Sequence, residues 1–150
     1  MKLGWKSIKI SIAGARLSHL VQENSKWDHG SMIEQVKTVF IYLKKAYLRS
    51  DPSIVKKCLT AKAYKITEAD IELQKENPFT DAELVSADIV SVLPSKYNRD
   101  KFKVLMKFKT NRDRGLEFSP RPISGARRQF QQQWLFICEG AWWLLDEINT

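Results

Sequence analysis

The chain lacks the features that mark several classes of protein. It has two cysteines among 150 residues, Cys58 and Cys138, too few for a disulfide framework. It has no apolar run of about eighteen residues, so the sequence predicts no transmembrane helix. Lys6 and Lys9 interrupt any apolar segment near the start, which argues against a secretory signal peptide. We expect one domain with a hydrophobic core and two reduced, buried thiols.

Motifs of common catalytic sites are also missing. The sequence contains no Gly-rich phosphate loop, HExxH, CxxC or GxSxG. His19 and His29 are expected at surface or helix-capping positions. Asp88 alternates with apolar neighbours and is expected to face away from the core. Asp146 and Glu147 are adjacent on a predicted strand, so we expect them on opposite faces, ending the strand or meeting nearby cations. The sequence therefore predicts no enzyme, metal site or cofactor.

Positive charge is what the sequence has in excess, and it is concentrated in one stretch. The formal net charge is +8. Residues 96–128 contain eleven basic and three acidic side chains, so they carry all of this charge and the rest of the chain is neutral. Such a distribution predicts an electropositive face.

The N-terminal segment, residues 1–24, is basic and has no single period. Alternating isoleucines suit a strand, whereas Leu17, Leu20 and Val21 have helical spacing. Three interpretations stay open: a basic presequence or membrane-surface arm, a packed first element, or the edge of a longer N-terminal region. We treat it as a basic arm before a domain spanning 25–150.

Helices are expected in the first half of that domain. Ser31 and Glu34 have the spacing of a capping box. The apolar stripe that follows comprises Met32, Val36, Val39, Phe40, Leu43 and Tyr47. Asp51-Pro52 begins a short second helix, and Thr60 can cap a third.

Strands follow, because the apolar period changes to two. Alternation predicts strands over 83–93 and 101–109, and two apolar runs, 130–138 and 141–148, flank a Gly-containing turn as in a β-hairpin. Helices followed by an antiparallel meander predict an α+β fold, with three N-terminal helices packed on a four-stranded sheet.

The second of these strands carries the strongest functional signal. Phe102, Val104, Met106 and Phe108 alternate with four lysines and Leu105, so the lysines are predicted on the opposite face. The candidate anion-binding residues are Lys101, Lys103, Lys107, Lys109, Arg112, Arg114, Arg127 and Arg128. Anionic lipid headgroups, ribosomal RNA and an acidic protein surface are the candidate partners, and a merely solvated face is the alternative. Exposed aromatic residues are few in this stretch, which makes base-specific recognition of single-stranded RNA the weakest option.

The closing hairpin resembles that of a known family. It reads Phe130-x-x-x-Trp134-x-Phe136, then a turn, then 143–148 as Trp-Leu-Leu-Asp-Glu-Ile. Looser similarity lies at 47–51, Leu59-Thr60 and Tyr64. The pattern is similar to the Tim-forty-four-like domain family, which includes a subunit of the mitochondrial inner-membrane import translocase, a related large mitoribosomal protein and bacterial relatives.

This resemblance implies a cone-shaped fold of the nuclear-transport-factor-two superfamily. It implies a non-enzymatic scaffold that docks to a membrane surface or a translocation-complex protein, at the cytoplasmic face of a bacterial inner membrane or the matrix side of the mitochondrial one. A ribosome-associated RNA-binding relative, or an enzyme or small-molecule carrier that uses the cone, is the alternative. The cone is either a packed core or an apolar pocket, and its candidate lining residues are Phe40, Tyr47, Met106, Phe108, Trp134 and Trp143.

Overall fold

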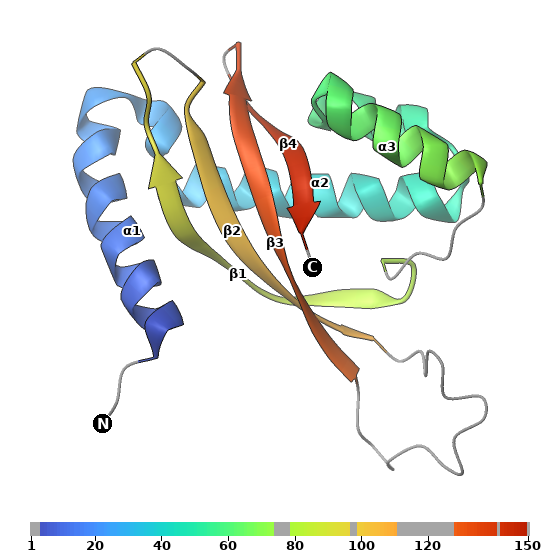
Figure 1. The fold of residues 1–150 in the computed structure, drawn as a ribbon, viewed down its shortest axis with the longest axis horizontal. Coiled ribbons are helices and arrows are strands. Elements are labelled where there is room, and N and C mark those ends of the chain that lie inside the picture. Colours follow the sequence, from blue (N-terminus) through green and yellow to red (C-terminus); the bar gives the residue numbers. More distant parts are fainter. Residues whose placement is uncertain (1–3, 74–78, 97–98, 111–127, 141, 150) are drawn as a thin grey trace.

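The computed structural model describes residues 4–73, 79–96, 99–110, 128–140 and 142–149. Helices come first in the chain and a four-stranded antiparallel sheet follows, as Figure 1 shows. The α+β class and the order of its parts are therefore confirmed. The sheet is open, with β1 and β4 as its edge strands.

The N-terminal segment forms a packed helix. Helix α1 (Trp5–Glu23) lies beside β1 (Figure 1) and buries Ala13 and Leu17. The Arg16 guanidinium also donates a hydrogen bond of 3.0 Å to the Val92 carbonyl of that strand. Of the three interpretations of this segment, the structure shows a packed first element. A short 3-10 turn, η1 (Ser25–Trp27), connects it to the next helix.

The long helix α2 (His29–Leu48) begins earlier than the capping-box spacing predicted. Its cap is Asp28, whose carboxylate accepts hydrogen bonds from the Ser31 amide at 2.9 Å and the Ser31 hydroxyl at 2.8 Å. These bonds hold the pKa of the Asp28 carboxyl below its usual value. The capping box at Ser31 and Glu34 is therefore wrong, because an acidic residue three positions earlier already satisfies the free amide.

The next two predicted helices differ from each other. Residues Pro52–Cys58 form a 3-10 helix, η2, which starts after the Asp51 cap. Helix α3 (Ala61–Glu72) begins at Thr60 as predicted, and the Thr60 hydroxyl accepts a hydrogen bond from the Ala63 amide. The expected set of three helices thus contains one 3-10 helix and omits α1.

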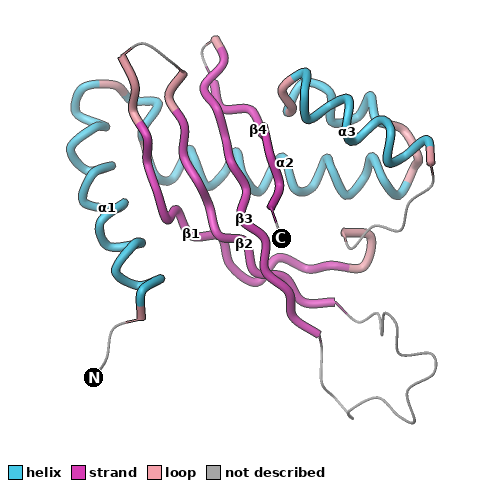
Figure 2. Tube along the Cα trace, in the orientation of Figure 1, coloured by secondary structure: helices cyan, strands magenta, loops and turns pink. Residues whose placement is uncertain are grey.

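All four predicted strands are present. They are β1 (Ala82–Leu93), β2 (Lys101–Thr110), β3 (Arg128–Glu139) and β4 (Trp142–Asn149), paired in the order β1-β2-β3-β4 (Figure 2). Gly140, with φ 67°, occupies the left-handed conformation in the turn between β3 and β4. Strand β1 has irregular register at two places, near Val85 and Val90, while β2 and β3 pair without interruption.

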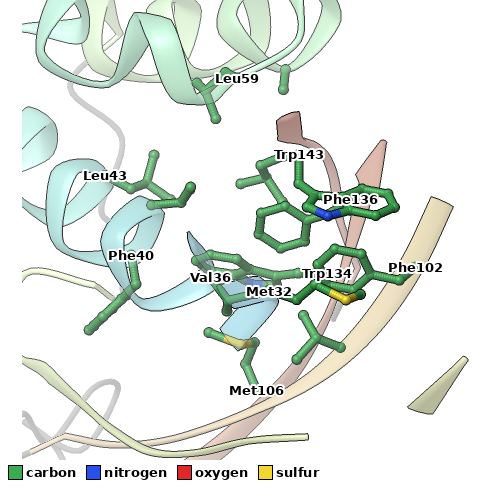
Figure 3. Packing of buried hydrophobic residues seen from close by; sticks show 14 of the residues in the cluster. Met32, Val36, Phe40, Leu43, Leu59, Phe102, Met106, Trp134, Phe136 and Trp143 are labelled. Carbon is green, nitrogen blue, oxygen red and sulfur yellow. The ribbon is translucent and has the colours of Figure 1, made fainter. Parts of the chain in front are cut away.

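The core lies between the inner face of the sheet and helix α2. Figure 3 shows Met32, Val36, Phe40 and Leu43 of α2 facing the aromatic side chains of the sheet. The inward residues of β2, predicted from their alternation, are completely buried: Phe102, Val104, Met106 and Phe108. Trp134 and Phe136 of β3 are also fully buried. The face turned away from this core is called the outer face below.

Edge strand β4 is joined to the start of α3. Its pairing with β3 is shifted between Leu135 and Phe136, which makes Asp146 an extra residue in β4. The Thr60 amide donates to the Leu145 carbonyl at 3.0 Å, and the Thr60 hydroxyl donates to Asp146 at 2.8 Å. These bonds cover part of the edge that β4 would otherwise expose.

Candidate anion-binding face

The predicted lysine row stands on the outer face. Lys101, Lys103, Lys107 and Lys109 alternate with the four buried residues of β2, and their side chains are half-buried. Because β2 is a central strand, the stems of these lysines lie between neighbouring strands while their ammonium groups can reach water. The period-two pattern thus places four cations in one line on an open sheet.

The strand on one side of the row is uncharged where it pairs with the last two lysines. Gln131 of β3 lies opposite Lys107, and Gln129 lies opposite Lys109. Neutral amides do not offset the positive charge of the row. They can, however, donate and accept hydrogen bonds with a polar ligand.

The strand on the other side supplies two acidic residues. Glu83 of β1 lies 3.4 Å from the Lys109 ammonium, and Asp88 lies 3.8 Å from the ammonium of Lys6. Both pairs are partly exposed, and exposed ion pairs contribute about 0–1 kcal/mol each. Within the described part of the chain, no acidic oxygen lies within 4 Å of Lys101, Lys103 or Lys107.

Helix α1 adds a fifth cation that the sequence did not connect with this face. Contact with the Lys107 side chain lowers the pKa of Lys6, because two ammonium groups placed together disfavour the charged form. Burial acts in the same direction, and Asp88 opposes it. The signal in the sequence was the absence of acidic residues before Glu23, but nothing local to that segment showed where it packs.

The predicted arginines are described only in part. Arg112, Arg114 and Arg127 lie outside the described residues. The backbone of Arg128 pairs with Thr110 at the first position of β3. The geometry of the face is therefore carried by the lysines.

The six candidate cone residues lie in the core, where most of them touch other aromatic rings. The ring centres of Phe40 and Phe108 are 5.2 Å apart, and those of Phe108 and Trp134 are 6.2 Å apart. Met106 is fully buried beside them. Tyr47 is half-buried, and its hydroxyl lies 3.4 Å from Asp70.

Trp143 packs at another point of the same core. Its ring centre lies 5.0 Å from that of Trp27 and 4.9 Å from that of Phe102, in edge-to-face geometry. Its indole N–H donates to the Lys26 carbonyl at 3.0 Å. Phe102 stacks on Phe136, which contacts Trp134, so these rings join those of Phe40 and Phe108 in one continuous core (Figure 3).

A shallow groove lies elsewhere, between α1 and the start of α2. Its volume is about 350 Å³, and its lining includes Leu17, Val21, Trp27 and the exposed His29. The other histidine, His19, is exposed on α1. Among the described residues, no group of three His, Cys, Asp or Glu side chains is placed to hold a metal ion.

The adjacent carboxylates of β4 both contact one cation. The Lys62 ammonium lies 3.1 Å from Asp146 and 2.7 Å from Glu147. The expectation that they meet a nearby cation is confirmed. The strict alternation expected for them is wrong, because Asp146 is the extra residue at the register shift. The hydrogen bond from Lys62 lowers the pKa of Glu147. In return, Glu147, and to a smaller extent Asp146, raises the pKa of Lys62.

No protein-family model matches this chain, and no curated protein matches it. Of the helices that the structure describes, none combines the length and apolar character that crossing a bilayer requires.

Proposed function

We propose that this protein is a non-enzymatic binding module that docks on an anionic membrane surface through the outer face of its sheet. The observation that carries the proposal is the row of four lysines on β2. Three of them have no acidic partner within the described residues, and Lys6 of α1, which is paired with Asp88, lies beside Lys107. A surface that serves solubility alone usually mixes both signs of charge.

The closing hairpin supports a more specific form of this proposal. Its sequence pattern lies on the last two strands of a four-stranded antiparallel sheet preceded by helices. This arrangement is compatible with the cone-shaped Tim-forty-four-like domain that the pattern resembles. We therefore propose a scaffold role in protein translocation, at the cytoplasmic face of a bacterial inner membrane or the matrix side of the mitochondrial one.

The expected strength of binding follows from the charges. Each lysine close to an anionic bilayer contributes about 1 kcal/mol, so four lysines together contribute about 4 kcal/mol. Lys109 contributes less than the others, because Glu83 already partly neutralises it. Such binding is reversible and suits recruitment to a surface rather than permanent anchoring.

The test is sedimentation with vesicles that contain phosphatidylglycerol or cardiolipin, compared with neutral phosphatidylcholine vesicles. The variant replaces Lys101, Lys103, Lys107 and Lys109 by Gln. A matched control replaces four exposed lysines on the helical side, Lys37, Lys56, Lys57 and Lys65, and so removes the same charge. We expect the outer-face variant to lose binding to anionic vesicles while the control variant keeps most of it.

Two results would overturn the proposal. Equal loss in both variants would show that binding follows net charge and not this face. Tighter binding to a structured RNA than to any vesicle, measured in parallel, would favour the ribosome-associated alternative. The melting temperature of each variant, expected within a few degrees of wild type because these side chains reach solvent, shows whether the comparison is valid.

A further inference from the structure

The two ends of the outer face differ in character. The turns between β1 and β2 and between β3 and β4 lie at the same end of the sheet (Figure 1). The sheet tip is defined here by outer-face and turn residues at that end: Leu93, Arg99, Lys101, Lys103, Ile137, Glu139, Trp142 and Leu144. At the other end, β3 offers Gln129 and Gln131 to the lysine row.

The sheet tip is apolar on a face that does not contact the core. Ile137 is 8% exposed, yet it lies outside the core cluster, and it pairs with Lys101 on one side and Leu144 on the other. Large apolar side chains at the strand ends remain open to solvent. Leu93 is 40% exposed and Trp142 is 39% exposed. Solvent-exposed tryptophan beside aliphatic residues is typical of a surface that contacts another phase or molecule.

The cations of the sheet tip are not all neutralised, and the same holds at the other end of the row, where Lys107 has no acidic partner among the described residues. Within the described residues, Lys101 and Lys103 have no acidic partner within 4 Å, whereas Lys109 is paired with Glu83. Arg99 is bound to Glu139, with 3.0 Å between guanidinium and carboxylate, but its side chain remains 58% exposed. An apolar centre flanked by long-stemmed lysines that no described carboxylate neutralises matches the boundary between lipid tails and anionic headgroups.

We infer that the sheet tip is the part of the protein that enters the interface of an anionic bilayer, with Trp142 as its interfacial anchor. This inference rests on the proposed function and assigns the contact to one end of the face. A second copy of the chain is a poor occupant, because pairing two such tips would place lysines of like charge together. A lipid surface supplies both negative charge for the lysines and an apolar boundary for the exposed side chains of the tip.

Trp5 is the competing anchor and makes the inference testable. It is 69% exposed on α1, but the Lys9 ammonium lies 5.6 Å above its ring. The contact of Lys6 with Asp88 places the start of α1 beside the middle of β1. The other three tryptophans, Trp27, Trp134 and Trp143, are at most 3% exposed. Membrane-dependent changes in fluorescence therefore report on Trp5 and Trp142.

The experiment measures quenching of tryptophan fluorescence by brominated lipids in phosphatidylglycerol vesicles. It compares wild type with Trp142→Phe and Trp5→Phe, and sedimentation with the same vesicles gives the bound fraction. We expect Trp5→Phe to retain quenching and binding. We expect Trp142→Phe to lose most of the quenching and to bind several-fold more weakly, with an unchanged melting temperature because the site is exposed.

The opposite pattern has a distinct meaning. If bound protein loses its quenching in Trp5→Phe and keeps it in Trp142→Phe, α1 makes the contact and the inference is overturned while the proposed function stands. If bound wild type shows no quenching, the protein stays above the headgroups and the anchor is rejected. If wild type does not bind anionic vesicles at all, the proposed function itself fails.

Discussion

Trp134 shows how much one side chain contributes to this fold. It is fully buried and contacts the rings of Phe40, Phe79 and Phe108, while its indole N–H donates to Gln132 at 2.9 Å. Burial of a large aromatic side chain and satisfaction of its polar atom both depend on the exact strand register. The outward neighbours Gln131 and Gln133 follow from the same register.

Replacement of Trp134 by Ala should lower the free energy of unfolding by about 3–5 kcal/mol, because it leaves a cavity and an unpaired Gln132 carbonyl. Urea denaturation followed by circular dichroism measures the loss. Trp142→Ala is the control, since that side chain is 39% exposed. Near-equal midpoints for the two variants would contradict the assigned faces of β3 and β4.

The Lys62 contact with Glu147 makes a prediction about pH. Lys62 lowers the folded-state pKa of Glu147, so the pair stabilises the fold above the unfolded pKa, about 4.3 for Glu, and this stabilisation is lost as pH falls through the folded value. Both groups are largely exposed, so the contribution is at most about 1 kcal/mol.

We therefore expect Lys62→Gln to be less stable than wild type at neutral pH, and the difference should shrink below about pH 4 as the carboxylate becomes protonated. Chemical denaturation at several pH values measures it. Lys65→Gln, on the same helix, serves as the control with no expected pH-dependent difference. A difference that persists undiminished in acid would show that Lys62 acts through packing instead.

Among the elements, the strands could be predicted and the first helix could not. In β2, four apolar residues alternate with four lysines and Leu105, so the apolar residues are predicted on one face, and the structure buries them there. Helix α1 buries two residues, Ala13 and Leu17, whereas Trp5 and Ile12 remain exposed. The apolar face of α1 is therefore too narrow to be recognised from the sequence without the strand that it packs against.

The same reasoning explains the smaller errors. Asp and Ser are both favoured N-cap residues, and the capping-box spacing predicted Ser31, whereas Asp28 caps the helix. The extra residue Asp146 accepts a hydrogen bond from Thr60, a partner 86 positions away in the chain. Long-range contacts of this kind leave no local pattern.

Helix α1 should also be the least stable of the long helices. It contacts β1 and η1, whereas α2 crosses the core and buries six residues. Leu17→Ala should cost about 2–4 kcal/mol locally. Hydrogen exchange should then speed up at the amides of α1 and remain slow in β2 and β3.

A variant with uniformly faster exchange would mean that α1 unfolds together with the sheet. Val21→Ala, at a half-buried position of the same helix, is the matched control and should have a smaller effect. The result bears on function, because Lys6 reaches the outer face only while α1 stays on β1.

For the whole molecule, one sheet separates two kinds of chemistry. Its inner face is a nearly continuous apolar layer against α2, and its outer face carries the lysine row. Stability and binding can therefore be changed independently, since the residues responsible alternate along β2. The sequence predicted this division, but the asymmetry between the two ends of the outer face emerged from the register with β1 and β3.

The most direct test of membrane docking is the partition of the wild-type protein onto phosphatidylglycerol vesicles as salt is raised. From about 0.1 M to about 1 M salt, the Debye length falls from about 10 Å to about 3 Å. We predict strong binding at the lower salt concentration, a steep decline across this range, and little binding to neutral vesicles throughout. Binding that is equal for neutral and anionic vesicles, or unaffected by salt, would contradict the proposal that the lysine face recognises negative charge.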